Sequence, residues 1–367
     1  MSTTMMIVLD TTETFADLRM DGANHTFLRS FVSRNPVKLV VPQIVVEETV
    51  NHFRESLSAH LQEARHAIRS VTRLAPDASV SISGDLSIEA ECNKYREHLK
   101  NRLLLADQAS YRDVDVASLV QRALFRRKPF DSGGKVGFRD AVLWETILQV
   151  AKSQPGEIVL VTRNKKDFGE HGQLHDHLRA DLVAKGLSHV PVTVCEGLNR
   201  FVGEHVKPNL EKLDGLQKQI DEGAFSAFDA AMFFAEWRME IVDELRGHVE
   251  KIDLDRVTAR SVYAFRNPQL DDTADTLDTF QVADVWRVTE DQLGVGIDYH
   301  LPGRIGCVQE SSIGPYGEPY DEEFVDAVKF VLLMTVVIEE TSGEVVSWEL
   351  NDLEVEVNGD WGFPDLD

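Results

Sequence analysis

The run Met5-Met6-Ile7-Val8-Leu9-Asp10-Thr11 places an acidic residue directly after a short apolar segment. Such a segment predicts a buried β-strand, and a helical pattern follows it to about Ser33. The same pairing then recurs, with a strand pattern over residues 38–41 and a helix that begins near Gln43. This alternation is typical of a parallel sheet with helical crossovers.

The alternation continues as far as Pro208, where we place a domain boundary. Residues 43–127 are rich in helical patterns, with breaks expected at 76–84 and near Ser110. A loop over 128–138 precedes the later elements. These are helices over 139–152 and 174–185, strands over 157–162 and 190–194, and a helix from Glu196. The sequence therefore predicts an α/β domain over residues 1–208, with a parallel sheet flanked by helices.

The second half has a different pattern, which predicts an α+β domain over residues 209–367. Alternating residues such as Leu353 and Val355, with Glu354 and Glu356 between them, indicate a strand with one buried and one wet face. We expect helices over 210–220 and 225–249, a change to strand patterns near Val257, and strands over 279–288, 293–299, 327–338 and 344–357, the last two joined by a hairpin turn at 340–343.

Charge is divided unevenly between the two halves. The chain of 367 residues has a formal net charge of -24. Residues 1–210 hold 27 Lys and Arg against 26 Asp and Glu, whereas residues 211–367 hold 11 against 36. Because phosphate binding depends on Lys and Arg, only the first half is suited to lie against a polyanion. The acidic second half could repel nucleic acid, dock a basic regulatory protein, or serve solubility alone.

The chain lacks the signals of a secreted or membrane protein. Its first apolar run is short and has no basic flank, and the longest later run, Phe330–Ile338, is far below the about 20 residues that a membrane span needs. The three cysteines show no paired spacing. We therefore expect a soluble, cytoplasmic protein without membrane contact, and self-association stays open.

Four acidic residues occupy positions that a parallel sheet brings to one edge. Asp10 ends the first strand, and Glu48 lies early in the helix after the second strand. Asp140 opens the helix after the glycine-containing loop, and Asp167 follows the strand over 157–162. Carboxyl ends of parallel strands form the ligand crevice of such folds. Each acid alone is more often a helix cap or a solvated group, and Glu47 competes with Glu48.

A cluster of four carboxylates implies a bound cation, because like charges repel unless a metal ion lies between them. Oxygen-only ligands suit Mg²⁺ or Mn²⁺ rather than zinc. Such ions activate a water molecule and stabilise the leaving oxygen in phosphodiester hydrolysis. We therefore predict that Asp10, Glu48, Asp140 and Asp167 are both metal ligands and catalytic residues.

The order and setting of these acids resemble the PIN domain, in particular PIN-like families with a Gly-Phe-Arg-Asp segment before the third acid. The resemblance covers residues 5 to about 170. It rests on four segments: Val8-Leu-Asp-Thr11, Pro42 to Glu48, Lys135-Val-Gly-Phe-Arg-Asp-Ala-Val-Leu-Trp144, and Val159-Leu-Val-Thr-Arg-Asn-Lys-Lys-Asp-Phe168. Many members of the family cleave RNA with Mg²⁺ or Mn²⁺, others cut structured DNA, and some are inactive. The chain departs from the family at Thr12, where Asn is common.

Further residues are expected to support the acids and the substrate. Thr11, Arg139 and Asn164 are the candidates for contacts that orient the carboxylates. A basic rim beside the third and fourth acids is expected to track nucleic-acid phosphates, unless its members only neutralise neighbouring acids. Its candidates are Arg127, Lys128, Lys135, Arg163, Lys165 and Lys166.

The sequence thus leads to three hypotheses about function. The first is a metal-dependent endoribonuclease of a toxin-like or defence-associated kind, with nucleic acid, in the first instance RNA, as its partner. The second is a catalytically silent module that binds RNA or a protein. The third is a nuclease of structured DNA. A phosphotransferase that uses Asp10 as a nucleophile is disfavoured, because no second acid lies two positions further on.

Overall fold

The computed structural model describes residues 4–75, 86–103, 109–154, 156–252, 265–273, 279–310 and 321–357. The chain divides into two compact units, Met1–Pro208 and Asn209–Asp367. Across those described ranges, every helix falls short of the combined length and apolarity that a membrane span requires.

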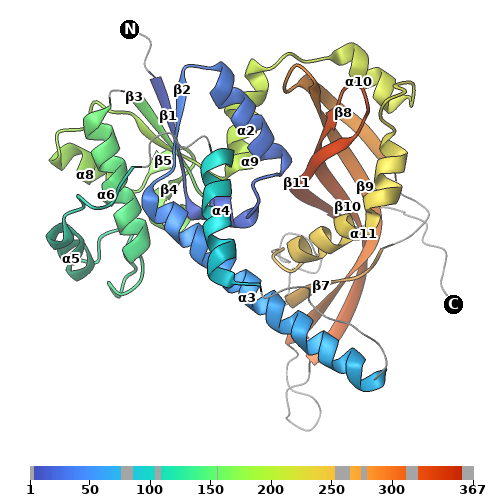
Figure 1. The fold of residues 1–367 in the computed structure, drawn as a ribbon, viewed down its shortest axis with the longest axis horizontal. Helices are drawn as coiled ribbons and strands as arrows, with labels where there is room; N and C mark the ends of the chain where they lie inside the picture. Colours follow the sequence, from blue (N-terminus) through green and yellow to red (C-terminus); the bar gives the residue numbers. More distant parts are fainter. Residues whose placement is uncertain are drawn as a thin grey trace. The chain divides into compact units, whose positions relative to one another are not determined.

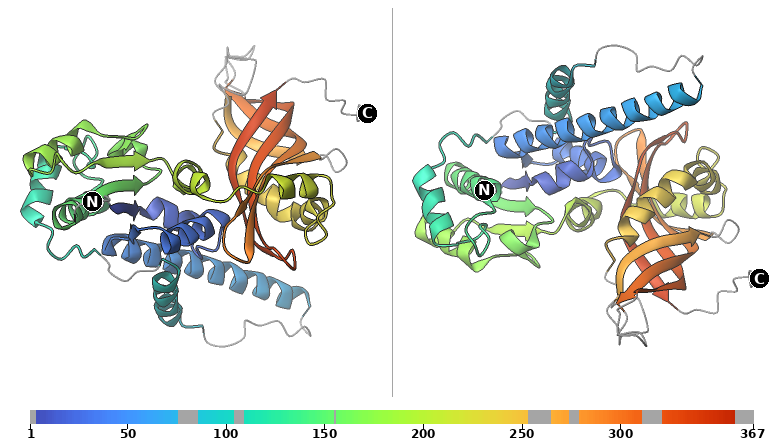
Figure 2. Two further views of the ribbon diagram at one scale, coloured as in Figure 1. Left: turned by 90° about the horizontal axis from the view of Figure 1, so that it is seen from above. Right: turned by 90° about the horizontal axis from the view of Figure 1, so that it is seen from below.

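A four-stranded parallel sheet forms the centre of the first unit (Figure 1). It comprises β1 (Thr4–Leu9), β2 (Val37–Val40), β3 (Gly156–Val161) and β6 (Val192–Cys195), in the order β2-β1-β3-β6. Helices flank the sheet, and Figure 2 shows the same arrangement from two other sides. The central strands β1 and β3 end in continuous buried apolar runs, as a strand covered on both faces must. The prediction of a parallel sheet flanked by helices is confirmed.

The helices of the first unit follow the predicted alternation. The helix after β2 begins at Gln43, and the helix before β3 begins at Phe138, one residue earlier than expected. The helices are α1 (Thr11–Ala16), α2 (Ala23–Arg34), α3 (Gln43–Leu74), α4 (Ile88–Arg102), α5 (Val116–Leu124), α6 (Phe138–Ser153), α7 (Lys165–Phe168), α8 (Asp176–Ala184) and α9 (Leu198–Phe201), the last followed by a π-helical turn (Val202–Val206) and a 3₁₀ turn (Lys207–Asn209).

Two local predictions in this unit were wrong in detail. The helix expected to run to Ser33 is divided into α1 and α2, because the Asp17 carboxylate accepts the backbone N–H groups of Met20 and Gly22 at 2.8 and 2.7 Å. Such a side chain competes with the helical hydrogen bonds and favours a turn. The helix expected from Leu174 begins at Asp176, because a short hairpin of β4 (Gly169–Glu170) and β5 (Gln173–Leu174) precedes it. The break predicted at 76–84 lies outside the described residues.

The second unit contains an antiparallel sheet, as the strand patterns predicted. Its strands are β7 (Phe265–Thr273), β8 (Thr279–Arg287), β9 (Gln292–Glu310), β10 (Asp321–Glu339) and β11 (Val345–Val357), with the order β11-β10-β9-β7. β8 pairs with the first part of β9 and β7 with its last part. The predicted hairpin is confirmed, since Ile338 is opposite Val345. The change to strand patterns predicted near Val257 falls on residues that are not described.

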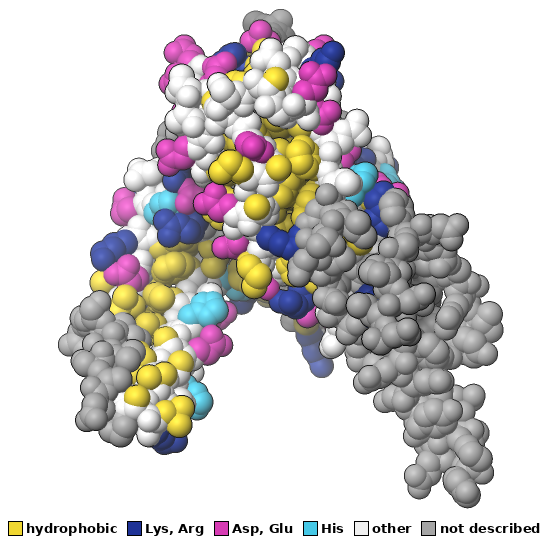
Figure 3. All heavy atoms as spheres, turned by 90° about the vertical axis from the view of Figure 1, so that its right-hand side faces the viewer, with side chains coloured by type: hydrophobic (Ala, Val, Ile, Leu, Met, Phe, Trp, Pro, Cys, Tyr) yellow, Lys and Arg dark blue, Asp and Glu magenta, His cyan; other side chains and the backbone are white. Residues whose placement is uncertain are grey.

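Helices pack on this sheet and complete the α+β unit. The helices α10 (Asp214–Asp221) and α11 (Ala230–Val249) bury one apolar face each in the core. The ring of Phe234 on α11 stacks on that of Tyr299 on β9, with centroids 3.9 Å apart. Figure 3 shows one face of the molecule, with Asp and Glu side chains scattered over its upper part.

Candidate metal centre

Asp10 lies at the carboxyl end of β1 and begins α1. Its carboxylate accepts the backbone N–H of Thr11 at 2.7 Å, as an N-cap does. The other carboxylate oxygen accepts the hydroxyl of Thr162 at 2.6 Å and that of Thr12 at 3.1 Å. The cap and the candidate ligand are therefore the same side chain. Burial raises the pKa of Asp10, and the bonds from Thr162, Thr11 and Thr12 oppose that rise.

Glu48 contacts Thr11, the residue after Asp10, whereas Glu47 contacts another helix. The Glu48 carboxylate accepts the hydroxyl of Thr11 at 3.0 Å and also pairs with the guanidinium of Arg139. Glu47 instead pairs with Arg96 of α4 at 3.2 Å, and 44 % of its side chain is exposed. The geometry thus favours Glu48 over Glu47 as the second of the four acids.

Asn164 joins the third and fourth acids. Its side-chain amide nitrogen lies 3.1 Å from a carboxylate oxygen of Asp140 and 3.1 Å from one of Asp167. Its backbone N–H donates to the Thr162 hydroxyl oxygen at 2.9 Å, and that hydroxyl donates to Asp10. A continuous set of hydrogen bonds therefore connects Asp10 with Asp140 and Asp167. The sequence drew attention to Asn164 as a supporting residue, and the structure places it between the two acids.

The pKa of Asp140 is affected by the other three acids. Burial raises the pKa of Asp140 to about 7, and the negative charges of Asp10, Asp167 and Glu48 add to the rise in that order. The positive charge of Arg139 opposes the rise. A carboxyl group whose pKa is raised by burial and by three neighbouring acids is typical of a functional site.

Thr162 and Thr12 are site residues that the sequence analysis did not propose. Thr162 follows β3 directly and is fully buried, and the backbone N–H of Asp10 donates to the carbonyl of Val161 at 3.1 Å. This pairing places Thr162 beside Asp10. The sequence did offer one signal for Thr162, since it is a polar residue directly after the apolar strand β3. Thr12, where the family often has Asn, takes part in the site through its bond to Asp10 and accepts the N–H of Arg163 at 3.1 Å.

The basic residues near the acids differ in how strongly they are engaged. Lys128 donates to Asp167 at 2.8 Å, with each side chain 19 % exposed. Arg127 pairs with the buried Asp181, and Lys165 pairs with the buried Glu196 at 2.5 Å. Arg163 lies 3.5 Å from Glu13. The side chains of Lys135 and Lys166 are exposed. The phosphate-binding rim stays a prediction, and several of its members also neutralise acids.

The donor set agrees with Mg²⁺ or Mn²⁺ in its chemistry. All four side chains offer carboxylate oxygens, which these cations prefer. Across the described ranges, no three His, Cys, Asp or Glu side chains gather closely enough to hold a metal ion. Two of the four acids instead use oxygens in ion pairs, Glu48 with Arg139 and Asp167 with Lys128. A metal ion would therefore have to compete with two cationic side chains.

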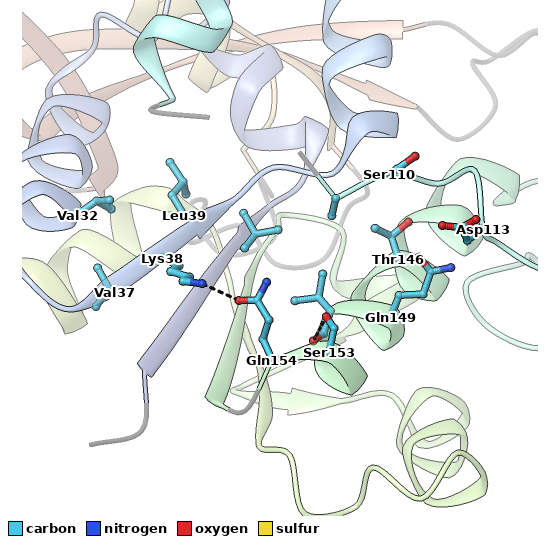
Figure 4. A pocket seen from close by; sticks show the side chains of 13 residues that line it. Val32, Val37, Lys38, Leu39, Ser110, Asp113, Thr146, Gln149, Ser153 and Gln154 are labelled. Atoms are coloured by element: carbon cyan, nitrogen blue, oxygen red, sulfur yellow. Dashed lines mark hydrogen bonds between the residues drawn. The ribbon is translucent and has the colours of Figure 1, made fainter. Parts of the chain in front are cut away.

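The pocket drawn in Figure 4 is a different feature. Its lining comes from β2, α6 and residues 109–113, together with Val32, and Lys38 donates to Gln154 across it at 3.1 Å. None of the four acids lines it: Asp10 follows β1, and the others lie on α3, α6 and α7. We therefore assign no part of the proposed chemistry to this pocket.

Comparison with known proteins agrees with the sequence resemblance. No curated protein and no solved structure matches the chain. A family profile described as PIN domain matches residues 7–168, a segment that includes all four acids, the end of β1 and the whole of β3. PIN domains are generally nucleases and usually use divalent metals such as Mg²⁺ or Mn²⁺. The match over residues 7–168 therefore supports a PIN-like nuclease domain in the first unit.

Proposed function

We propose that the first unit is a divalent-metal-dependent endoribonuclease whose site is formed by Asp10, Glu48, Asp140 and Asp167. The observation that carries this proposal is the hydrogen-bonded set Asp10–Thr162–Asn164, which ends on Asp140 and Asp167 together. Here one neutral amide holds two carboxylates, Asp140 and Asp167, and its backbone is connected through Thr162 to a third, although Asp167 also pairs with Lys128. A toxin-like or defence-associated role belongs to the same proposal.

The protein's own groups would prepare the site in three ways. Thr162 and the N–H of Thr11 fix the rotamer of Asp10. The Thr11 hydroxyl holds Glu48, and Asn164 keeps Asp140 and Asp167 together. Fixed ligands reduce the reorganisation needed in a reaction. A bound Mg²⁺ or Mn²⁺ would supply activation of water and stabilisation of the leaving oxygen.

A catalytically silent module is the second candidate, and one observation favours it. Lys128 and Arg139 already neutralise Asp167 and Glu48, so the acids have partners without any metal. If these pairs persist in Mn²⁺, the domain binds RNA or a protein without cleaving it. Metal binding therefore separates the two candidates.

The test of activity uses the whole chain with labelled single-stranded RNA, single-stranded DNA and a structured DNA, each in Mn²⁺ and in EDTA. We expect internal cleavage of RNA in Mn²⁺ and none in EDTA. Cleavage of the structured DNA alone would show that structured DNA, and not RNA, is the substrate. Intact substrates together with tight RNA binding would support the silent module.

Lys166 should contribute to RNA binding more than Lys165. Lys166 is exposed at the start of α7, whereas Lys165 pairs with the buried Glu196. Replacing Lys166 with Ala should reduce the magnitude of the log–log salt dependence of RNA affinity by roughly 0.7, the value of one single-strand phosphate contact. Lys165→Ala is the matched control and should change the slope less. Fluorescence anisotropy at several salt concentrations measures both slopes, and equal slopes in all three proteins would remove Lys166 from the rim.

A chain that ends at Pro208 should fold and bind RNA at least as tightly as the whole protein. Residues 1–208 form a compact unit of their own, which supports independent folding. Removing residues 211–367 also removes an excess of acidic charge. Long-range repulsion from that charge is strongest at low salt. Affinities of the two proteins at matched low salt provide the measurement. Clearly weaker binding by a folded, shortened chain would show that the second unit supplies part of the RNA surface.

A further inference from the structure

A cluster of buried charges lies beside the acid site but is not part of it. The side chains of Arg122 on α5, Glu145 on α6 and Asp181 on α8 are only 4–7 % exposed. The Arg122 guanidinium donates to Asp181 at 2.5 Å and to Glu145 at 3.3 Å. The indole N–H of Trp144 also donates to Asp181, at 2.9 Å. The sequence analysis did not single out Arg122, Glu145 or Asp181, because the contacts among their three helices form only in the folded domain.

Stability alone is a weak reason for such a cluster. Removing ions from water costs more than their mutual attraction commonly returns, and apolar side chains of similar volume often stabilise a core at least as well. What an apolar side chain could not do is bind a backbone carbonyl. Arg122 does so, since its other terminal nitrogen donates to the carbonyl oxygen of Lys128 at 2.6 Å.

The segment around Lys128 is also held by other contacts. The backbone N–H of Lys128 donates to the Nδ1 atom of His177 at 3.1 Å, and Arg127 pairs with Asp181 at 2.7 Å. The carbonyl oxygen of Pro129 lies against Gly137, so close that a Cβ atom there would be 2.4 Å away. With its backbone fixed by these contacts, Lys128 directs its ammonium group to Asp167 at 2.8 Å.

We infer that Arg122, held by Asp181 and Glu145, is a positioning residue that fixes Lys128 in the acid site so that the lysine binds a phosphate oxygen of the RNA. This inference rests on the proposed function. The lysine is largely enclosed and carries a compact charge, which suits contact with a single phosphate oxygen. Without RNA, the same ammonium group neutralises Asp167 and competes with a divalent cation.

The experiment is a double-mutant cycle of Arg122→Met and Lys128→Ala in the whole chain, with KM and kcat measured for single-stranded RNA in Mn²⁺. Each single variant should raise KM about tenfold, the equivalent of one charge-assisted hydrogen bond. The double variant should be no worse than Lys128→Ala alone, because Arg122 acts through Lys128. If Arg122→Met raises KM by the same factor in both backgrounds, or only lowers the melting temperature, the inference is wrong.

Two further variants keep this test decisive. Lys185→Met removes another partner of Glu145, 2.8 Å away, without touching the Lys128 segment, so it should lower stability and leave KM unchanged. If Arg122→Met does not fold, Arg122→Lys replaces it. The lysine ammonium group keeps a positive charge near Asp181 but cannot also donate hydrogen bonds to Glu145 and to the carbonyl oxygen of Lys128.

Calorimetric titration with Mn²⁺ separates this inference from the proposed function. Lys128→Ala should bind Mn²⁺ several-fold more tightly than the wild type, since Asp167 loses its competing cation. Arg122→Met should do the same only while Lys128 is present. That pattern in a protein that cleaves no RNA would retain the positioning role and overturn the nuclease proposal. If the wild type cleaves RNA but the two variants change Mn²⁺ affinity independently, the nuclease proposal is retained and the positioning role is wrong.

Discussion

Replacing Asp140 with Asn should abolish cleavage in Mn²⁺ while making the metal-free protein more stable. The variant removes one anionic ligand, and we expect kcat to fall by more than about 100-fold, since even hydrogen-bond partners of metal ligands are worth 10–100-fold. Asn keeps an oxygen that can accept from Asn164, so the local hydrogen bond persists. Initial rates on labelled RNA measure the loss.

The expected gain in stability comes from the same electrostatics. The pKa of Asp140 is raised to about 7, so the folded state holds this proton more tightly than the unfolded state. Stability therefore falls as the pH rises from the ordinary value of 3.8 to about 7, and at pH 8 the whole cost of the buried charge is present. Asn carries no charge and removes that cost. At pH 8 in EDTA, Asp140→Asn should melt at a higher temperature than the wild type, and Mn²⁺ should stabilise only the wild type.

Asp176→Asn is the matched control for this prediction. Asp176 is also an acid in the first turn of a helix, but its side chain is 85 % exposed and pairs with Arg179. We expect unchanged cleavage and a slightly lower melting temperature, as loss of a favourable charge at a helix start predicts. If Asp140→Asn behaves like this control, Asp140 is a helix-start residue and no metal ligand.

Replacing Gly137 with Ala should destabilise the first unit strongly. Gly137 precedes α6 with φ at +109°, and a Cβ atom there would lie 2.4 Å from the carbonyl oxygen of Pro129 and 2.9 Å from the Cα of Phe130. Strained backbone and an overpacked contact each cost about 1–3 kcal/mol, so we expect a loss of about 3 kcal/mol. For a unit of this size the melting temperature should fall by roughly 10 °C. Thermal unfolding followed by circular dichroism measures the change.

Gly186→Ala separates the backbone strain from the close contact. Gly186 also has a positive φ, +70°, but has open space where a Cβ atom would be added. Its replacement should cost only about 1 kcal/mol, the ordinary penalty of a left-handed position. Equal losses in the two variants would show that the Pro129 segment moves away easily, and would weaken the argument that this segment is held rigidly beside the site.

The fold of the first unit could be predicted because its local signals agree with its tertiary contacts. The apolar runs that end at Leu9 and Val161 become neighbouring parallel strands, and Leu9 is opposite Val161 in the register. The helix from Gln43 begins where the sequence indicated. The break after Ala16 was missed, because a helical pattern does not reveal that the Asp17 side chain will capture two backbone N–H groups.

The contacts between distant segments could not be predicted from one sequence. The hydrogen bond from Thr162 to Asp10 joins the ends of two strands that are adjacent only in the folded sheet. The hydrogen bond from Arg122 to Asp181 joins two different helices. Residue type identified the four acids as candidates, yet only the fold shows which partners they have. The ion pair of Lys165 with Glu196 is a further example, since it distinguishes Lys165 from Lys166, and the two lysines looked equivalent in the sequence.

The most direct test of the central claim is anomalous diffraction from crystals of the whole chain grown in Mn²⁺. We predict a manganese peak among the carboxylates of Asp10, Glu48, Asp140 and Asp167, with the Lys128 ammonium group displaced from Asp167. The absence of a peak, with Lys128 still bound to Asp167 and Arg139 to Glu48, would contradict the assignment of these acids as a metal site.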